Sequence, residues 1–339
     1  MFQTSTPRKP LLVPTPSGLY CEPGDFYIDP RRSVSKALIT HAHSDHARAG
    51  SKAYLCALPC VSLLRHRLGT RACISGIPYG EKTTIGDVSV SFHSAGHILG
   101  SAQIRMEANG EVWVFSGDYK RAEDPTCPQF EAIHCDTFIT ESTFGLPIYR
   151  WDSGARIAGE ILDWWNGCRE AGRAAILYSY SLGKAERILA ELAQITDRDV
   201  FVHETIQSVV ACYREAGIRM LPTLPIPEER SDQLFSGQLI LVPPNAGTSP
   251  WMERVAEYET AFASGWMMTR SSRRLCGFDR GFILSDHADW PALIQTAQES
   301  GADRVLVTHG NCKLMVQYLR EQGIDASPLE IATPGPLNH

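Results

Sequence analysis

Four side chains that could bind a metal ion fall within six consecutive residues of this chain. The apolar stretch Ala37–Thr40, which predicts a strand, is directly followed by His41, His43, Asp45 and His46. Neutral imidazoles and ionised carboxylates suit divalent transition metals. If the strand continued, alternation would turn the first three to one side, and a turn at Asp45 would redirect His46. This spacing predicts two metal ions close together, which is hydrolase chemistry.

Further candidate ligands also come directly after short apolar segments. They are His97, Asp118, Glu141, His287 and His309. Strand ends are where an α/β scaffold gathers a site, because the sheet fixes the backbone and the loops present side chains. One such histidine alone is more often structural, so the joint occurrence of these residues is what indicates a site.

The size and composition of the chain are those of an ordinary globular protein. Of its 339 residues, 43% are hydrophobic and 21% are charged, enough for one large domain or two moderate ones. No apolar run approaches the roughly 20 residues that cross a bilayer, and residues 1–10 are polar and lack a signal core. We therefore expect a soluble, cytoplasmic protein that does not act at a membrane.

Cysteine usage and net charge exclude some classes of function. The ten cysteines are scattered without a Cys-x-x-Cys pair, which favours free thiols over disulfides or a cysteine-based zinc site. The formal charge of −6 argues against a surface coated in basic residues for nucleic-acid binding. It does not exclude phosphodiester chemistry, because two bound cations would make the active site locally positive.

A strand-rich beginning gives way to alternating strands and helices. The early pattern predicts a helix at 58–68 and strands at 26–28, 37–40, 53–55, 88–92, 102–106, 112–115 and 136–140. The middle predicts helices at 154–171, 185–193 and 205–216 between strands at 174–178, 200–202 and 238–242. This alternation implies a parallel sheet with crossover helices. The end predicts strands at 281–284 and 304–307, helices at 290–298 and 312–321, and an irregular tail from Ser327.

Taken together, these residues resemble the metallo-β-lactamase fold of binuclear metallohydrolases. The His-x-His-x-Asp-His run is the signature of that fold, and the resemblance covers nearly the whole chain. It implies an α/β protein built as an αββα sandwich, in which Asp29 orients the ligands. The ligands it implies are His41, His43 and His97 for one ion, Asp45, His46 and His309 for the other, and Asp118 as the bridge.

The middle and end of the chain resemble the β-CASP subgroup of that fold, whose members act on nucleic acids. Glu141–Gly145 matches its motif A, His287 its motif B and His309 its motif C. The resemblance implies a first metallo-β-lactamase part at 1–147, an inserted α/β β-CASP domain at 148–283 and a return segment at 284–339. Length and the residues around motifs A and B look most like the bacterial ligase-associated DNA exonucleases.

The activity implied is metal-dependent hydrolysis of nucleic acid, here by a DNA exonuclease in DNA repair. Two divalent ions, zinc or manganese, would bind a bridging water whose hydroxide attacks phosphorus. Asp45 would act through its metal, and His287, held by Glu141, would protonate the leaving oxygen. The expected substrate is DNA with single-stranded ends, and the resemblance implies association with an ATP-dependent DNA ligase and a helicase.

Residues expected to bind substrate surround the later motifs. They are Ser142, Thr143, Ser179, Tyr180, Ser181, Lys184, Arg270, Arg273 and Arg274. A serine-rich turn before a helix attracts anions, and Lys184 adds charge. The arginine cluster is read either as the lining of a substrate groove or as a solvated face.

Two other functions compete with this interpretation. An RNA-processing ribonuclease of the same fold would differ only in groove contacts that sense the 2′-hydroxyl. A small-molecule metallohydrolase, such as a thioesterase or lactonase, would use the same ligands. The inserted region 148–283 speaks against the second, because a small substrate needs no additional domain of that size.

Overall fold

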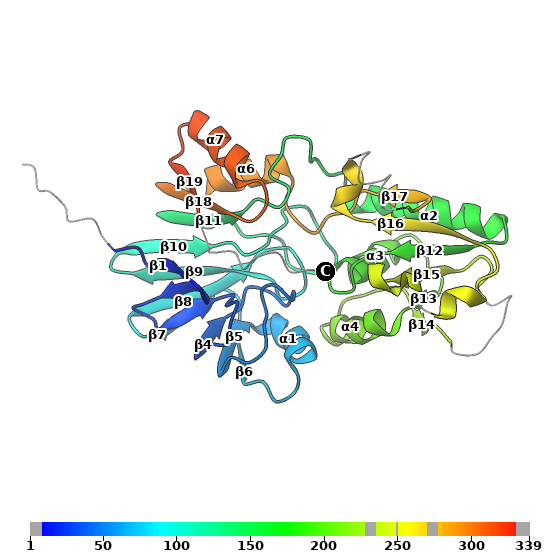
Figure 1. Cartoon of the computed structure of the whole chain (residues 1–339), viewed down its shortest axis with the longest axis horizontal. Helices are drawn as coiled ribbons and strands as arrows, with labels where there is room; N and C mark the ends of the chain where they lie inside the picture. The colour runs from blue at the N-terminus through cyan, green and yellow to red at the C-terminus, as the bar shows by residue number, and fades with distance from the viewer. Residues whose placement is uncertain (1–8, 228–234, 249, 270–276, 330–339) are drawn as a thin grey trace, which may run out of the picture.

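The computed structural model describes residues 9–227, 235–248, 250–269 and 277–329, which form two lobes side by side (Figure 1). One lobe, on the left in this view, contains two β-sheets and is built from both the beginning and the end of the chain. The other lobe, in green and yellow, contains a third sheet built from the middle of the chain.

The first lobe is built on a six-stranded and a seven-stranded sheet. The six strands of the first sheet are, in spatial order, β1 (Leu12–Thr15), β2 (Gly18–Cys21), β3 (Phe26–Ile28), β4 (Lys36–Leu38), β5 (Ala53–Ala57) and β6 (Ile74–Ile77). The seven strands of the second are β19 (Ala326–Pro328), β18 (Arg304–Thr308), β11 (Thr137–Glu141), β10 (Glu111–Phe115), β9 (Ala102–Ala108), β8 (Val88–Ser94) and β7 (Lys82–Ile85).

These two sheets pack face to face and carry helices on their outer faces. Phe26 and Leu38 from the first sheet share one buried core with Phe92, Met106 and Trp113 from the second. Helix α1 (Val61–Leu68), preceded by a 3-10 turn at Leu58–Cys60, packs outside the first sheet. Helices α6 (Trp290–Glu299) and α7 (Cys312–Glu321) pack outside the second. The layers are therefore helix, sheet, sheet and helix, which is the α/β sandwich predicted from the sequence.

The third sheet is parallel throughout, as the alternation of strands and helices predicts. Its strands are, in spatial order, β14 (Thr223–Pro225), β13 (Val200–Val202), β15 (Leu239–Val242), β12 (Ala174–Tyr178), β16 (Tyr258–Ala263) and β17 (Arg280–Phe282). One face is covered by α2 (Gly154–Glu170), α3 (Lys184–Leu192) and α4 (Glu204–Glu215). The other is covered by the 3-10 turns Pro244–Thr248, Pro250–Arg254 and Gly265–Met268. All six strands lie inside the segment 148–283, whose exact boundaries stay a prediction.

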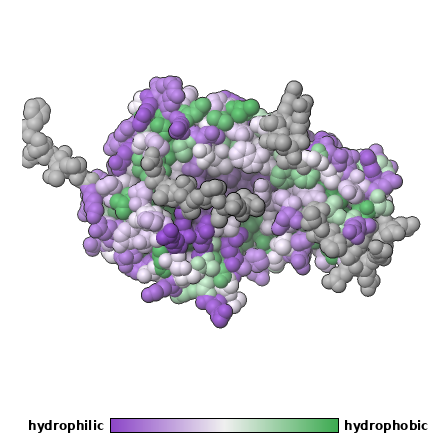
Figure 2. Space-filling model, viewed as in Figure 1, coloured by the Kyte–Doolittle hydropathy of each residue, from purple (hydrophilic) through white to green (hydrophobic). Residues whose placement is uncertain are grey.

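The core beneath α1 continues into the second lobe. Leu63 and Leu64 of α1 belong to the same buried cluster as Ile188 of α3 and Val209 of α4. The two lobes are thus joined by apolar packing, which holds the residues at their junction in fixed relative positions. Hydrophobic residues elsewhere lie scattered in small groups over the face seen in Figure 2.

Two expectations about strand ends were wrong. Strand β4 ends at Leu38, so Thr40 and the histidines after it lie in a loop, and strand alternation does not place them. The tail from Ser327 is not wholly irregular, because Ala326–Pro328 pairs in parallel with β18 as β19. Within the described residues, no helix combines the length and the apolar character that crossing a membrane requires.

Candidate metal centre

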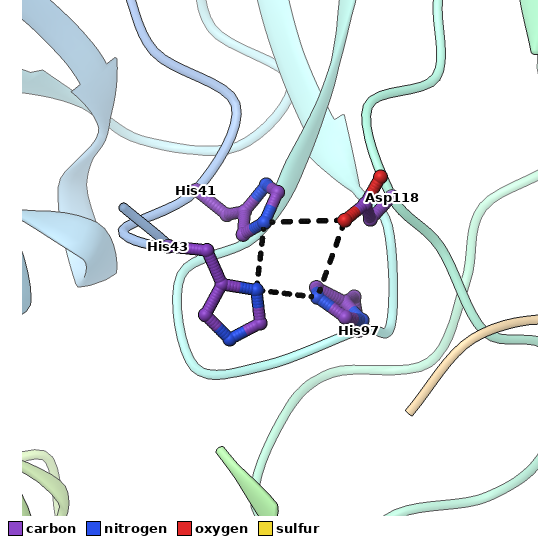
Figure 3. A group of neighbouring side chains, drawn as sticks. All are labelled: His41, His43, His97 and Asp118. Carbon is purple, nitrogen blue, oxygen red and sulfur yellow. Dashed lines mark hydrogen bonds and ion pairs between the residues drawn. The ribbon is translucent and has the colours of Figure 1, made fainter. Parts of the chain in front are cut away.

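Three imidazoles and one carboxylate converge on a common point in the first lobe (Figure 3). His41 Nε2 lies 3.0 Å from His43 Nδ1, which lies 3.2 Å from His97 Nε2. Asp118 Oδ2 lies 3.5 Å from His41 Nε2 and 3.9 Å from His97 Nε2. All four donor atoms lie within 4.8 Å of one another, so these residues, here called the metal cluster, could hold a metal ion.

The protein binds the outward nitrogen of each imidazole in the metal cluster. His41 Nδ1 lies 3.0 Å from the Thr40 hydroxyl, and His43 Nε2 and His97 Nδ1 donate to the carbonyls of Leu182 and Asp286 at 2.9 Å and 2.6 Å. Because a carbonyl only accepts, His43 and His97 carry their protons outward and turn lone pairs inward.

The charge state of these imidazoles also suits a bound cation. Burial lowers the pKa of both His41 and His97 well below 6.5, and neighbouring imidazoles lower it further. The lone pairs of neutral His43 and His97, which face each other at 3.2 Å, repel unless a cation lies between them. The donor set therefore fits a divalent metal ion.

Asp29 fixes the loop that carries four of the predicted ligands. Its carboxylate accepts from the Thr40 backbone at 2.8 Å and the Thr40 hydroxyl at 2.6 Å, and it lies 2.7 Å from His46 Nδ1. Burial acts to lower the pKa of His46, but the carboxylates of Asp118, Asp29 and Asp45 outweigh it and raise the pKa to about 10. The structure thus places Asp29 in contact with His46, one of the ligands that the resemblance implies it orients.

A second group of predicted ligands surrounds His46. Its Nε2 lies 3.6 Å from Asp45 Oδ2 and 3.5 Å from Asp118 Oδ2. The ring centroid of His309 lies 5.7 Å from that of His46. Asp118 therefore lies close both to the histidines of the metal cluster and to His46 of this second group.

The turn that carries His309 is held against the end of β11. Strands β11 and β18 pair in parallel with Glu141 opposite Thr308. Ser142 donates its hydroxyl hydrogen bond to the His309 carbonyl. At Gly310, with φ of 69°, a Cβ atom would lie 2.1 Å from the Ser142 carbonyl oxygen, so glycine is required. Ser142 is buried in this role and does not line the cavity described below.

Glu141 and His287 form a carboxylate–imidazole pair next to the metal cluster. His287 Nδ1 lies 2.9 Å from Glu141 Oε2, and the Tyr119 backbone donates to Glu141 Oε1 at 2.8 Å. The ring centroids of His287 and His97 are 4.7 Å apart. Burial acts to lower the pKa of His287, but Glu141 and then Asp118 outweigh it and raise the pKa to about 9. A protonated imidazole at neutral pH can serve as a general acid.

The metal cluster opens on a cavity of about 390 Å³ between the lobes. Its walls include residues 43–45 and 67 of the first lobe, and residues 180–182, 184 and 264–266 of the second. Four of the predicted substrate-binding residues line it, namely Thr143, Tyr180, Ser181 and Lys184. Ser179 is fully buried and does not line it. Arg270, Arg273 and Arg274 lie outside the described residues.

Buried charges join the two lobes beside the metal cluster. This ionic cluster consists of Lys120, Asp124, Lys184, Arg187 and Asp286. Lys184 Nζ lies 2.7 Å from Asp286 Oδ2, and Arg187 Nε lies 3.3 Å from Asp124 Oδ2. Burial acts to raise the pKa of Asp286, but Lys184, Lys120 and Arg187 outweigh it and hold the pKa far below its usual range.

The ionic cluster is connected to the metal cluster through one residue. The carboxylate of Asp286 belongs to the ionic cluster, while its carbonyl accepts from His97 Nδ1. Arg187 also donates to the neighbouring Ser285 carbonyl at 2.7 Å. Sequence reasoning named only Lys184 of this cluster, and as a phosphate-binding residue. The ion pairs between the lobes leave no local pattern, because their partners, such as Lys184 and Asp286, lie far apart in the sequence. Asp286 next to His287 was nevertheless a signal that could have been used.

Comparison with known proteins finds relatives named as nucleases, while no family model matches. The chain is 29% identical over 312 residues to a "Probable DNA ligase" of Opitutus terrae, covering 91% of this chain and 30% of that protein. It is 24% identical over 183 residues to an "RNase J-like protein" of Methanocaldococcus jannaschii, covering 47% and 43%. It is 29% identical over 147 residues to "Endoribonuclease YSH1" of Yarrowia lipolytica, covering 42% and 17%.

The fold is shared with a solved structure. A crystal structure of a protein of unknown function from Enterococcus faecalis V583 matches with a TM-score of 0.59 at 12% identity, over 87% of this chain and 79% of that one. The chain spans less than half the length of each curated relative above. Together the relatives support the metallo-β-lactamase/β-CASP nuclease family, whose members use divalent metals. They do not separate DNA from RNA, because one is named a DNA ligase and two are named as ribonucleases.

Proposed function

We propose that this chain is a metal-dependent phosphodiesterase of nucleic acid and, more narrowly, a DNA exonuclease in DNA repair. The observation that carries the proposal is the metal cluster, whose inward lone pairs open on a cavity shared with a protonated imidazole. A hydrolase of phosphodiesters needs both parts, because charge builds on the phosphate and a proton must reach the leaving oxygen.

Two ions would be held by the two groups of ligands. We assign His41, His43 and His97 to one ion, Asp45, His46 and His309 to the other, and Asp118 to both, because its carboxylate lies 3.5 Å from both His41 and His46. Zinc or manganese would supply an activated water and positive charge for the phosphate oxygens. Histidine and aspartate ligands suit either metal.

Other residues of this chain would donate the proton, orient the ligands and contact the substrate. Glu141 binds His287 at Nδ1, which leaves Nε2 as the nitrogen that donates a proton to the leaving oxygen. Asp29 orients His46, and the Asp286 carbonyl orients His97, so the ligands are held before a metal binds. Thr143, Ser181 and Tyr180 line the cavity as substrate contacts.

DNA is the substrate we favour over RNA. The relative that aligns with 91% of this chain is named a probable DNA ligase, so a sequence like this one occurs within a protein of that name. This supports the part of the proposal that associates the chain with a DNA ligase. We further propose that this ligase is ATP-dependent and that the chain acts with it and a helicase in end processing in the cytoplasm. A ribonuclease is the second candidate, because other relatives are named as ribonucleases.

Digestion of end-labelled substrates tests the proposal. Single-stranded DNA, double-stranded DNA and RNA of matched sequence would be incubated with the protein and either Zn²⁺ or Mn²⁺. We expect stepwise shortening of DNA that needs an unpaired end, and loss of this activity in Asp45→Ala and His46→Ala although both variants fold. Cleavage of RNA alone would contradict the DNA assignment, and near-normal activity in either variant would contradict the binuclear centre.

A further inference from the structure

An arginine that the metal-ligand motifs do not include lines the cavity on the side of the ligand loop. Arg67 lies in the last turn of α1, and its Nε donates to the carbonyl of Ala42, between His41 and His43. Arg67 lines the cavity together with Ser44 and Asp45, and the Asp45 carboxylate is close enough to act on its charge. The anchor to Ala42 therefore fixes this cation relative to the ligand loop itself.

Arg67 differs from the other cation that lines the cavity. Lys184 is buried and paired with Asp286 at 2.7 Å, so its charge is neutralised within the ionic cluster. Among the residues that the structure describes, no carboxylate lies within ion-pair distance of Arg67, and its one hydrogen bond uses Nε alone. The two terminal amino groups of a guanidinium carry four more N–H donors in a planar fork that matches a phosphate.

The second lobe contributes to the cavity an aromatic surface suited to a nucleobase. Trp266 is 42% exposed and its ring centroid lies 4.8 Å from that of Phe144, with both residues lining the cavity. Bases stack on such aromatic surfaces in proteins that hold unpaired strands. A volume of about 390 Å³ is that of a small-molecule site and accommodates one unpaired nucleotide.

We propose that Arg67 binds a backbone phosphate of an unpaired strand and sets which phosphodiester reaches the metal centre. This inference rests on the proposed function and identifies a residue that binds the substrate. Because Arg67 is tied to the Ala42 carbonyl, a phosphate held by its fork lies in a fixed register with the ligand loop. Arg67 is then a substrate-binding residue, and its contribution is to affinity and not to the chemical step.

The test compares Arg67→Met with Arg65→Met in the metal-loaded protein, using an end-labelled single-stranded oligonucleotide that the wild-type protein cleaves. Arg65 lies on the same helix, is exposed and does not line the cavity, so its variant removes one charge without touching the site. We expect Arg67→Met to raise KM by about tenfold to hundredfold with kcat changed less than about threefold.

The slope of log(kcat/KM) against log[salt] should become shallower by about one. Arg67→Lys should restore part of the affinity, and Arg65→Met should stay within about twofold of wild type.

Metal content and thermal unfolding of each variant distinguish substrate binding from support of the loop. If Arg67→Met loses bound metal or kcat while KM and the salt dependence stay unchanged, Arg67 only supports the ligand loop and the inference is overturned. If Arg67→Met does not fold, the KM and the salt dependence of Arg67→Lys decide between the two roles. The two proposals fail in different ways. If the wild-type protein cleaves no nucleic acid with any metal, the proposed function is contradicted. If the wild-type protein cleaves but Arg67→Met has an unchanged KM, only the inference about Arg67 is contradicted.

Discussion

Two groups of buried polar side chains lie next to each other at the junction of the lobes, and they are built in opposite ways. In the ionic cluster each charge meets an opposite charge, as Lys184 meets Asp286 and Arg187 meets Asp124. In the metal cluster, neutral imidazoles turn lone pairs toward one another, and Asp118 faces the same point. A saturated cluster stabilises the arrangement of the lobes, whereas an unsaturated one is a site for a cation.

The largest effect is expected from removing a ligand of the metal cluster. His97→Ala deletes one of the converging nitrogens, and we expect cleavage to fall well beyond the 10–100-fold that loss of a supporting contact typically causes. Without metal, the same variant should lose less stability than truncation of a buried side chain usually costs, because relief of the repulsion in the cluster offsets part of the cavity and the lost hydrogen bond to the Asp286 carbonyl. Urea unfolding in chelator and a cleavage assay in Mn²⁺ check the two halves. A variant that is as active as wild type would remove His97 from the centre.

A smaller loss of turnover is expected from His287→Ala. The variant lacks the proton donor that Glu141 holds, so kcat should fall by about 10²–10⁴-fold. Metal content measured by atomic emission should remain that of wild type, since His287 is assigned no metal. Loss of an ion from this variant would show that His287 is a ligand, and would extend the metal cluster toward Glu141, which with Asp118 and His287 also forms a compact donor group.

The ionic cluster should respond in stability more than in chemistry. Arg187→Met removes one buried cation from Asp124 and Asp286, which keep Lys120 and Lys184 as their other partners. We therefore expect a loss of about 3 kcal/mol in the free energy of unfolding, at the lower end of what a broken buried ion pair costs. Arg156→Met is the matched control, because Arg156 pairs with Asp152 at 2.9 Å on the surface, where loss of a pair costs under about 1 kcal/mol. Urea denaturation of metal-free protein measures both. Equal effects of the two substitutions would show that the ionic cluster does not stabilise the junction.

A gradual, pH-dependent effect, small within any one pH unit, is expected at Glu186 on α3. Burial raises the pKa of Glu186 from 4.5 to about 8, so the folded protein keeps a proton that the unfolded chain releases at lower pH. Wild-type stability should therefore fall relative to Glu186→Gln as pH rises from about 4.5 to about 8, by on the order of 1 kcal/mol per pH unit, and the difference should be constant above that range. Urea denaturation at pH 5, 7 and 9 measures the difference. A difference that does not change with pH would show that Glu186 is ionised in the fold.

The sequence analysis could predict the composition of the centre but not its geometry. His41, His43, His97 and Asp118 follow apolar segments, and parallel strands bring such ends together, so their convergence follows from local pattern and sheet topology. The loop after Leu38 was not predicted, because a short apolar run carries no mark of the residue at which its backbone pairing stops. Strands β1, β2, β6, β7, β14 and β16 were also not identified, since they are short, lack strong alternation or lie at sheet edges.

The contacts between the lobes were beyond the reach of local patterns. Arg187 pairs with Asp124 and Asp286, and Arg67 binds the Ala42 carbonyl. These contacts form only when the helices and loops that carry the residues pack together. Lys184 shows the consequence, because a helix-start lysine after a serine-rich turn predicts a phosphate site, yet here it is paired within the ionic cluster. Helix boundaries were predicted well where a cap is local, as at Asp289, whose side chain accepts from the Ala292 backbone at the start of α6.

The most direct test of the central claim follows metal binding and cleavage together in one titration. Chelator-treated protein would receive increasing Mn²⁺, with bound metal and cleavage of single-stranded DNA measured at each step, alongside the Asp118→Ala variant. The arrangement around Asp118 predicts that wild type binds two ions and cleaves only when the second is bound, and that the variant does not cleave. Cleavage by metal-free protein, or full cleavage by Asp118→Ala, would contradict it.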